Sequence, residues 1–234
     1  MVEFGNEVPR RSFDDILPAE MRSKRFRIDP LELPGISTAP PEISAQAAYW
    51  AEYLSRAKMS PTAVFGYCSG SVLATSLAAH FKSREVPLIL FDPVIPTPDT
   101  TQSLLVDLAI GMDSGLAPSA IPRIGGIARD VALKEASRFL HAIALRCAPD
   151  LPDDVAEALT EKQRAWLGYT LTAASVTDTG ASPDHVFLST TGIHSNETGV
   201  VPRRFPVDAV GLFRSALVQT TLAELLLAGR VTDA

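Results

Sequence analysis

Apolar and polar positions near the middle of the chain follow the order of a strand, a helix and a second strand. The short apolar run of residues 62–67 predicts a buried strand. Apolar side chains then recur at helical spacing from Val72 to Leu77, which predicts an amphipathic helix. The run Val86–Phe91 predicts another buried strand, which ends at Asp92. The pattern is that of a βαβ unit with polar groups after both strands.

The segment before this unit carries a weaker pattern. Residues 1–22 are charged and contain two prolines, which indicates a loose arm or a short helix around Phe13–Leu17. Alternation over Arg25–Asp29 predicts a half-buried strand. A stripe of apolar residues from Ile43 to Leu54 predicts a helix.

Beyond Asp92 the chain becomes rich in alanine and leucine for about 80 residues, a pattern that predicts several helices over residues 99–180. Thr160 and Gln163 match a capping box and predict that one of these helices begins there. Extended patterns return at His185–Thr190 and briefly at residues 204–207. A last helix is predicted at about residues 212–228.

These elements predict an α/β fold, with a mostly parallel sheet flanked by helices. We expect one domain over residues 1–234, with residues 99–180 as a helical insertion within it. The hydrophobic fraction of 46% is ample for a buried core, so a disordered chain is not expected.

Charge and cysteine content narrow the functional classes. The formal net charge is −6, and short basic runs such as Arg203-Arg204 do not make a surface that tracks phosphates, so no nucleic-acid partner is expected. The two cysteines, Cys68 and Cys147, make a disulfide framework unexpected. The N-terminus is polar and every apolar run is soon broken, so we expect no signal peptide, no membrane association and a cytoplasmic location. The sequence predicts no metal site.

The junction between the first strand and its helix carries the strongest chemical signal, the pattern Gly66-x-Cys68-x-Gly70. It matches a nucleophile elbow with cysteine in the place of serine, in which small residues let the strand and helix approach closely. A thiol at a helix N-terminus is more readily ionised, and backbone N–H groups there, from Ser69 onward, can stabilise an oxyanion. The alternative is that Cys68 is a small buried thiol with a packing role.

The elbow, the strand ending at Asp92 and the helical insertion together resemble the thioesterases of nonribosomal-peptide and polyketide synthesis, in the α/β-hydrolase superfamily. The resemblance implies that Cys68 carries an acyl group, that Asp92 orients a histidine and that the insertion acts as a lid. Asp92 precedes Pro93, so a simple turn-forming role is the alternative. Two features depart from the family, because no apolar strand opens the chain and residues 209–214 before the last helix lack the family's histidine. We therefore expect an N-terminally reduced hydrolase-like fold.

Four histidines could replace the missing base. His80 lies in the helix after the elbow, His141 lies in the insertion, and His185 begins a strand at the end away from the catalytic edge. His194 lies in a loop after a strand, at the edge where ligands bind in open α/β sheets, and is therefore the expected base. A role as an ordinary surface histidine is the alternative.

A cysteine nucleophile changes the expected reaction. An acyl group on Cys68 remains a thioester, comparable in activation to the phosphopantetheine thioester of a carrier protein, so exchange between thiols is close to thermoneutral. The leading hypothesis is an acyl or aminoacyl transferase that acts on an acyl or peptidyl carrier protein and has no cofactor of its own. The alternatives are a catalytically silent protein that binds a carrier or other partner, and an editing thioesterase that hydrolyses acyl thioesters.

Overall fold

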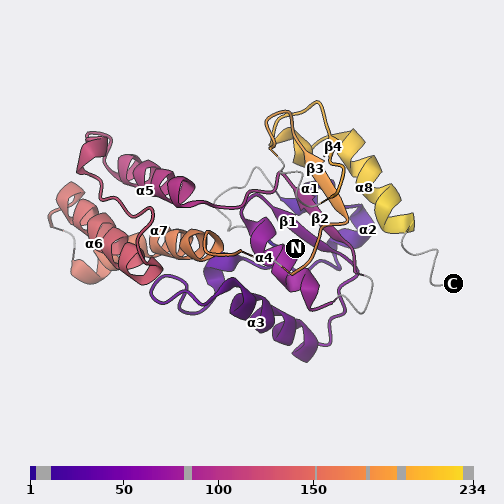
Figure 1. Ribbon diagram of the computed structural model, residues 1–234, viewed down its shortest axis with the longest axis horizontal. Helices are drawn as coiled ribbons and strands as arrows, with labels where there is room; N and C mark the ends of the chain where they lie inside the picture. The colour runs from indigo at the N-terminus through magenta and orange to yellow at the C-terminus, as the bar shows by residue number, and fades with distance from the viewer. Residues whose placement is uncertain (4–11, 82–85, 151, 178–179, 194–198, 229–234) are drawn as a thin grey trace. The chain divides into compact units, whose positions relative to one another are not determined.

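A computed structural model gives the positions of most of the chain (Figure 1). The structure describes residues 1–3, 12–81, 86–150, 152–177, 180–193 and 199–228. The chain forms two compact units. The first, here the α/β unit, comprises residues 1–30, 44–94 and 178–234, and the second, the helical unit, comprises residues 31–43 and 95–177.

The α/β unit is built on a four-stranded sheet in which every pairing is parallel. Its strands are β1 (Val64–Tyr67), β2 (Leu88–Phe91), β3 (His185–Leu188) and β4 (Arg203–Arg204), in that spatial order. The predicted βαβ unit and its parallel sheet are confirmed. The carboxyl ends of all four strands lie at one edge, where Cys68 follows β1 and Asp92 follows β2.

Residues near the N-terminus extend this sheet beyond β1. Val2 forms parallel bridges with Gly66 of β1 and with Ile28. The half-buried strand predicted over Arg25–Asp29 is reduced to this one bridge, and the chain then turns into the 3-10 helix η1 (Pro30–Glu32). Val2 is fully buried, so the start of the chain belongs to the core of the unit.

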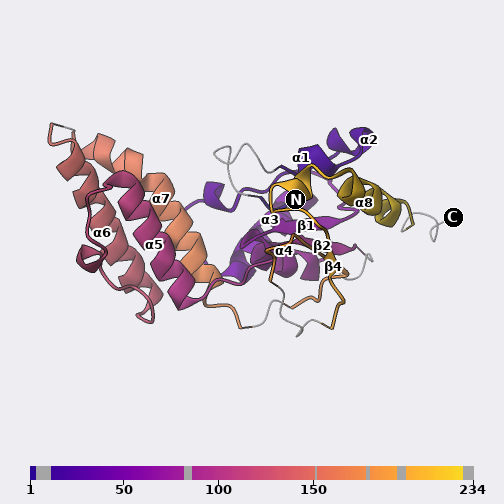
Figure 2. The ribbon, with the colours of Figure 1, turned by 90° about the horizontal axis from the view of Figure 1, so that it is seen from above.

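Phenylalanine side chains dominate the core on one face of the sheet. Phe13, from α1 (Phe13–Ile16), is fully buried and lies 5.2–5.5 Å from the rings of Phe65, Phe91 and Phe213. The short helix predicted around Phe13 is therefore confirmed, and it is a part of the core rather than a loose arm. The same core takes in the 3-10 helix η5 (Gly211–Phe213) and α8 (Ala216–Ala228), which lie on the same side of the sheet as α1 (Figure 2).

The opposite face of the sheet is covered by α4 (Gly70–Ala79), the helix that leaves the elbow (Figure 2). Nearly every residue of α4 is buried, Ser71 and Thr75 included, so the helix is buried on all sides rather than amphipathic as predicted. The helix predicted from Ile43 is α3 (Ile43–Arg56), which buries Ala47, Trp50 and Leu54 as its apolar stripe predicts. The short helix α2 (Ala19–Arg22) completes the unit.

The helical unit packs α5 (Pro98–Met112), α6 (Arg129–Cys147) and α7 (Asp153–Ala173) against one another, with η3 (Pro118–Ala120) between α5 and α6. Its core consists of leucine, isoleucine and alanine side chains. The segment 31–43 is held close to α7 at Gly168, where a Cβ would lie 2.1 Å from the carbonyl oxygen of Ile36. The predicted helices are confirmed, and the lid role of residues 99–180 remains a prediction.

One predicted helix boundary is wrong. Thr160 lies inside α7, fully buried, and its hydroxyl donates a hydrogen bond to the carbonyl oxygen of Ala156 at 3.0 Å. The capping box occurs instead at Thr97 and Thr100, where α5 begins. A local motif matched at Thr160 because threonine can serve both as a cap and as a residue that bonds back along its own helix.

Candidate active site at the carboxyl edge of the sheet

Cys68 lies in the left-handed backbone region between β1 and α4, with a φ of +51°. Its N–H donates a hydrogen bond to the carbonyl oxygen of Phe91 at 3.1 Å. Its own carbonyl oxygen accepts from the N–H groups of Ser71 and Val94, each at 3.1 Å. A residue other than glycine keeps this conformation only where the surroundings enforce it, and such positions concentrate at functional sites.

Gly66 makes this elbow possible by bringing β1 into direct contact with α4. A Cβ at position 66 would lie 2.6 Å from Cβ of Ala74 and 2.8 Å from Cα of Ser71, which is too close for non-bonded carbon atoms. The close approach inferred from the sequence is therefore present at Gly66. Gly70 is the buried first residue of α4.

Cys68 is not disulfide-bonded, and the residue as a whole is half-buried. Ser69 and Gly70 follow it at the start of α4, where the first N–H groups of a helix point away from the helix body. The other cysteine, Cys147, ends α6 in the helical unit and is exposed, and its Sγ lies 3.6 Å from the carbonyl oxygen of Met112. The two thiols thus differ in setting, because only Cys68 lies at a strained junction of strand and helix.

Asp92 holds the equivalent place after β2 and also has a positive φ, of +40°. Its N–H donates a hydrogen bond to the carbonyl oxygen of Phe187 at 2.9 Å, and its Oδ1 atom accepts one from the N–H of Ser189 at 2.8 Å. A Cβ at Gly192 would lie 2.1 Å from the same Oδ1. The carboxylate therefore lies between β2 and the turn that follows β3.

The described histidines all lie away from this edge or in the other unit. His80 is the exposed C-cap of α4, at the opposite end of that helix from Cys68. His141, in the helical unit, lies 2.8 Å from Oδ1 of Asp153. His185 begins β3, at the amino edge of the sheet, and its pKa is lowered by burial and then by the charge of Arg203, partly opposed by Asp184. His194 lies outside the residues that the structure describes, and the last described residue before it is Ile193.

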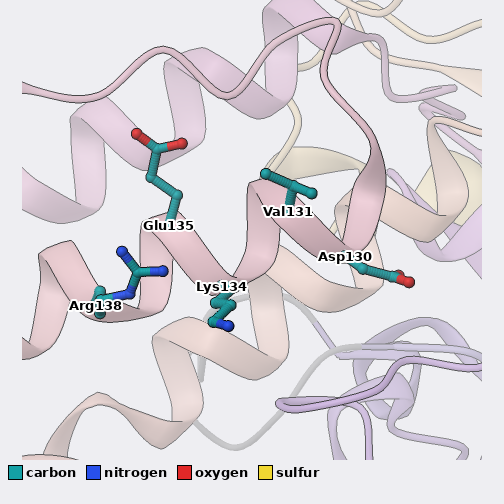
Figure 3. A pocket seen from close by; sticks show the side chains of 5 residues that line it. All are labelled: Asp130, Val131, Lys134, Glu135 and Arg138. Atoms are coloured by element: carbon teal, nitrogen blue, oxygen red, sulfur yellow. The ribbon is translucent and has the colours of Figure 1, made fainter.

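Two surface depressions lie elsewhere. One is lined by five residues that all belong to α6, as Figure 3 shows: Asp130, Val131, Lys134, Glu135 and Arg138. Its lining offers charged side chains and one valine but no thiol or hydroxyl group. The other, which includes Leu88, Ser182 and Asp184, lies at the amino ends of β2 and β3, opposite the Cys68 edge. No group of three metal-ligating side chains occurs among the residues that the structure describes.

Three further residues at the edge were not identified from the sequence: Ser189, Gly192 and Arg204. Ser189 and Gly192 contact Asp92 directly, and Arg204 donates hydrogen bonds to the carbonyl oxygens of Ser189 and Gly192. A glycine in a loop just after a predicted strand was the available signal for Gly192. Arg204 gave none, because its role arises from the pairing of β4 with β3.

Comparisons with known proteins leave the family open. No model of a known protein family matches the sequence, and no curated protein matches it. Among solved structures, the chain is similar to the Vlm2 thioesterase domain with genetically encoded 2,3-diaminopropionic acid bound with a dodecadepsipeptide. The TM-score is 0.40 and the identity 16%, over 81% of this chain and 75% of that chain. At this level of similarity, function has to be inferred from the geometry of the site itself.

None of the helices that the structure describes combines the length and hydropathy needed to cross a lipid bilayer.

Proposed function

We propose that the chain is an acyl or aminoacyl transferase that uses Cys68 as a covalent nucleophile. The observation that carries this proposal is the backbone of Cys68, held at a φ of +51° between β1 and α4 by hydrogen bonds on both sides of the residue. Such a junction presents a side chain above the edge of a sheet, where chemistry is performed in folds of this class. The half-buried Cys68 residue is not sealed in the interior, in keeping with the proposed role.

In the proposed reaction the Cys68 sulfur attacks the carbonyl carbon of an acyl thioester, whose phosphopantetheine arm belongs to a carrier protein. The bond between the acyl carbon and the pantetheine sulfur breaks, and that sulfur leaves with a proton. An acceptor thiol, amine or hydroxyl then attacks the Cys68 thioester, and the Cys68 thiol is released. No oxidant or metal is consumed, and the energy of the thioester bond is kept through the first step.

The other residues of the edge have proposed roles in these steps. The N–H groups at Ser69 and Gly70 would stabilise the oxyanion of the tetrahedral intermediate, with Gly66 allowing the elbow to form. Asp92 would orient the base that takes up and returns the proton, and His194 is the proposed base. The helix N-terminus favours the thiolate and so lowers the demand on that base.

Intact-mass spectrometry after incubation with an acyl-pantetheine tests the proposal. The wild type should gain one acyl group, and addition of a second thiol should remove it. Cys68→Ala should gain none, while Cys147→Ala, which removes the exposed cysteine of the helical unit, should behave as the wild type. Rapid release of free acid without transfer would indicate a hydrolytic editing enzyme instead.

A second function is a catalytically silent protein that binds a carrier protein or another partner. The observation that favours it is the placement of His80 and His185, neither of which lies at the carboxyl edge of the described sheet, while His141 belongs to the helical unit. In that case neither the wild type nor Cys147→Ala would take up an acyl group, while a carrier protein would still bind to both.

A further inference from the structure

The turn after β3 closes on one oxygen of Asp92, Oδ1. Oδ1 accepts the Ser189 N–H at 2.8 Å and would lie 2.1 Å from a Cβ at Gly192, so Gly192 closes directly over this oxygen. No hydrogen bond to Oδ2 occurs among the residues that the structure describes. A carboxylate held by one oxygen in this way presents its second oxygen in a fixed direction.

Two side chains hold that turn in place. The Ser189 hydroxyl is buried, accepts the Gly192 N–H at 3.1 Å and lies 3.3 Å from the Thr191 hydroxyl. Arg204, on β4, uses Nη1 to donate to the carbonyl oxygens of Ser189 at 3.4 Å and of Gly192 at 3.0 Å. Arg204 therefore ties the first and last residues of the turn to the sheet.

A planar guanidinium suits this task because its donors are fixed relative to one another, whereas a lysine ammonium is a flexible point charge. The backbone of Arg204 is itself fixed by its pairing with Leu188, the residue immediately before the turn. The adjacent Arg203 pairs with Phe187 and points to the other side of the strand, since side chains alternate along a strand.

We propose that Arg204 is a positioning residue, which holds the Ser189–Gly192 turn against Asp92 and so fixes the direction of the Asp92 carboxylate. This inference rests on the proposed acyl transfer through Cys68. Arg204 touches neither the thiol nor the acyl group in this scheme, and acts only through the turn and Asp92. Loss of its hydrogen bonds should let the carboxylate rotate or shift, and a displacement of about 1 Å can cost up to about 100-fold in rate.

The test compares Arg204→Ala and Arg204→Lys with Arg203→Ala in acyl transfer from an acyl-pantetheine to N-acetylcysteamine. We expect Arg204→Ala to lower kcat about 10-fold to 100-fold with little change in KM, because binding of the substrate does not involve the turn. Arg204→Lys should recover part of the loss by reaching one carbonyl oxygen. Arg203→Ala should keep the wild-type kcat and KM, since its side chain lies on the other side of the strand.

Thermal unfolding of each variant separates positioning from stability. A lowered kcat at an unchanged unfolding midpoint supports the inference, and if Arg204→Ala does not fold, Arg204→Lys decides in the same way. If Arg204→Lys, and Arg204→Ala where that variant folds, keep the wild-type kcat, then Arg204 only stabilises the turn. The inference would then be wrong, while the proposed function would stand. Absence of any acyl group on wild-type Cys68 would instead overturn both.

Discussion

Cys68 and Asp92 occupy equivalent places on neighbouring strands. The residues just before them, Tyr67 and Phe91, are partners in the sheet, so the two side chains leave the same edge at the same level. Both residues have a positive φ, +51° and +40°, which is unusual outside glycine. Two strained residues on neighbouring strands are typical of a functional site, where the required positions of the side chains are kept despite the cost of backbone strain.

Release of this strain should be measurable at Cys68. Glycine tolerates the left-handed region while alanine does not, so we expect Cys68→Gly to be more stable to urea than Cys68→Ala by about 1 kcal/mol. Fluorescence of Trp50 in a Trp166→Phe background would report on the α/β unit. Lys58, which follows α3 and has a φ of +55°, is the matched control. Lys58→Gly should exceed Lys58→Ala in free energy of unfolding by a similar amount, and both variants should still be acylated. A Cys68→Gly variant less stable than Cys68→Ala would contradict the assignment of strain.

The contact between β1 and α4 predicts a large effect at Gly66. Gly66→Ala places a methyl group 2.8 Å from the Ser71 backbone, which cannot rotate away, so we expect a loss of about 2–3 kcal/mol in the free energy of unfolding. Gly111→Ala, in α5, meets no atom within 4 Å and should be neutral or slightly stabilising. Equal stabilities of the two variants in urea titrations would show that α4 can move away from the strand.

The burial of Phe13 predicts that the N-terminal segment contributes strongly to the stability of the core. Its ring is fully buried against Phe65, Phe91 and Phe213, so Phe13→Ala should cost about 3–5 kcal/mol of stability. Val131→Ala, which truncates an exposed side chain, should change stability by less than about 0.5 kcal/mol. Denaturant titration of both variants measures the difference, and a Phe13→Ala variant as stable as Val131→Ala would mean that this segment contributes little.

The part of the fold around Cys68 is predictable because its signals are local. Two short apolar runs, a glycine pattern and an apolar helix define the βαβ unit within about 30 residues. Val2 and Phe13 are different, since a single bridging residue and a four-residue helix carry no periodic pattern. Their places are set by pairing and packing with residues far along the chain, such as Gly66 and Phe213.

In the candidate site, too, some features can be predicted from local sequence and others depend on tertiary contacts. Asp92 is found from its place after a predicted strand, whereas its contacts with Ser189 and Gly192 join segments about 100 residues apart. Arg204 enters only because β4 pairs with β3. Local motifs therefore locate the proposed nucleophile Cys68 and the neighbouring Asp92, and tertiary contacts determine how the carboxylate is held.

His185 predicts a component of the pH dependence of stability. Its pKa is lowered by burial and by Arg203, so the folded state disfavours the protonated ring relative to the unfolded chain. The resulting stability is present above about pH 6.5, the usual histidine pKa, and is lost as the pH falls through the lower folded-state pKa. We expect His185→Gln to weaken the fall in unfolding free energy on acidification below about pH 6.5. Arg203→Gln should weaken it partly, and an unchanged slope in both would contradict this origin.

Replacement of the sulfur by oxygen distinguishes a thiol-dependent mechanism from a general hydrolase site. Serine is scarcely ionised at neutral pH and needs a strong base, while cysteine is partly thiolate, so Cys68→Ser should be acylated at least about 100-fold more slowly. Any adduct that forms would be an oxyester, which a second thiol should remove far less readily than the wild-type thioester. Time courses of intact mass measure both rates. A Cys68→Ser variant that is acylated as fast as the wild type and releases free acid would mean that a strong base is present and that hydrolysis, rather than exchange between thiols, is the reaction of this site.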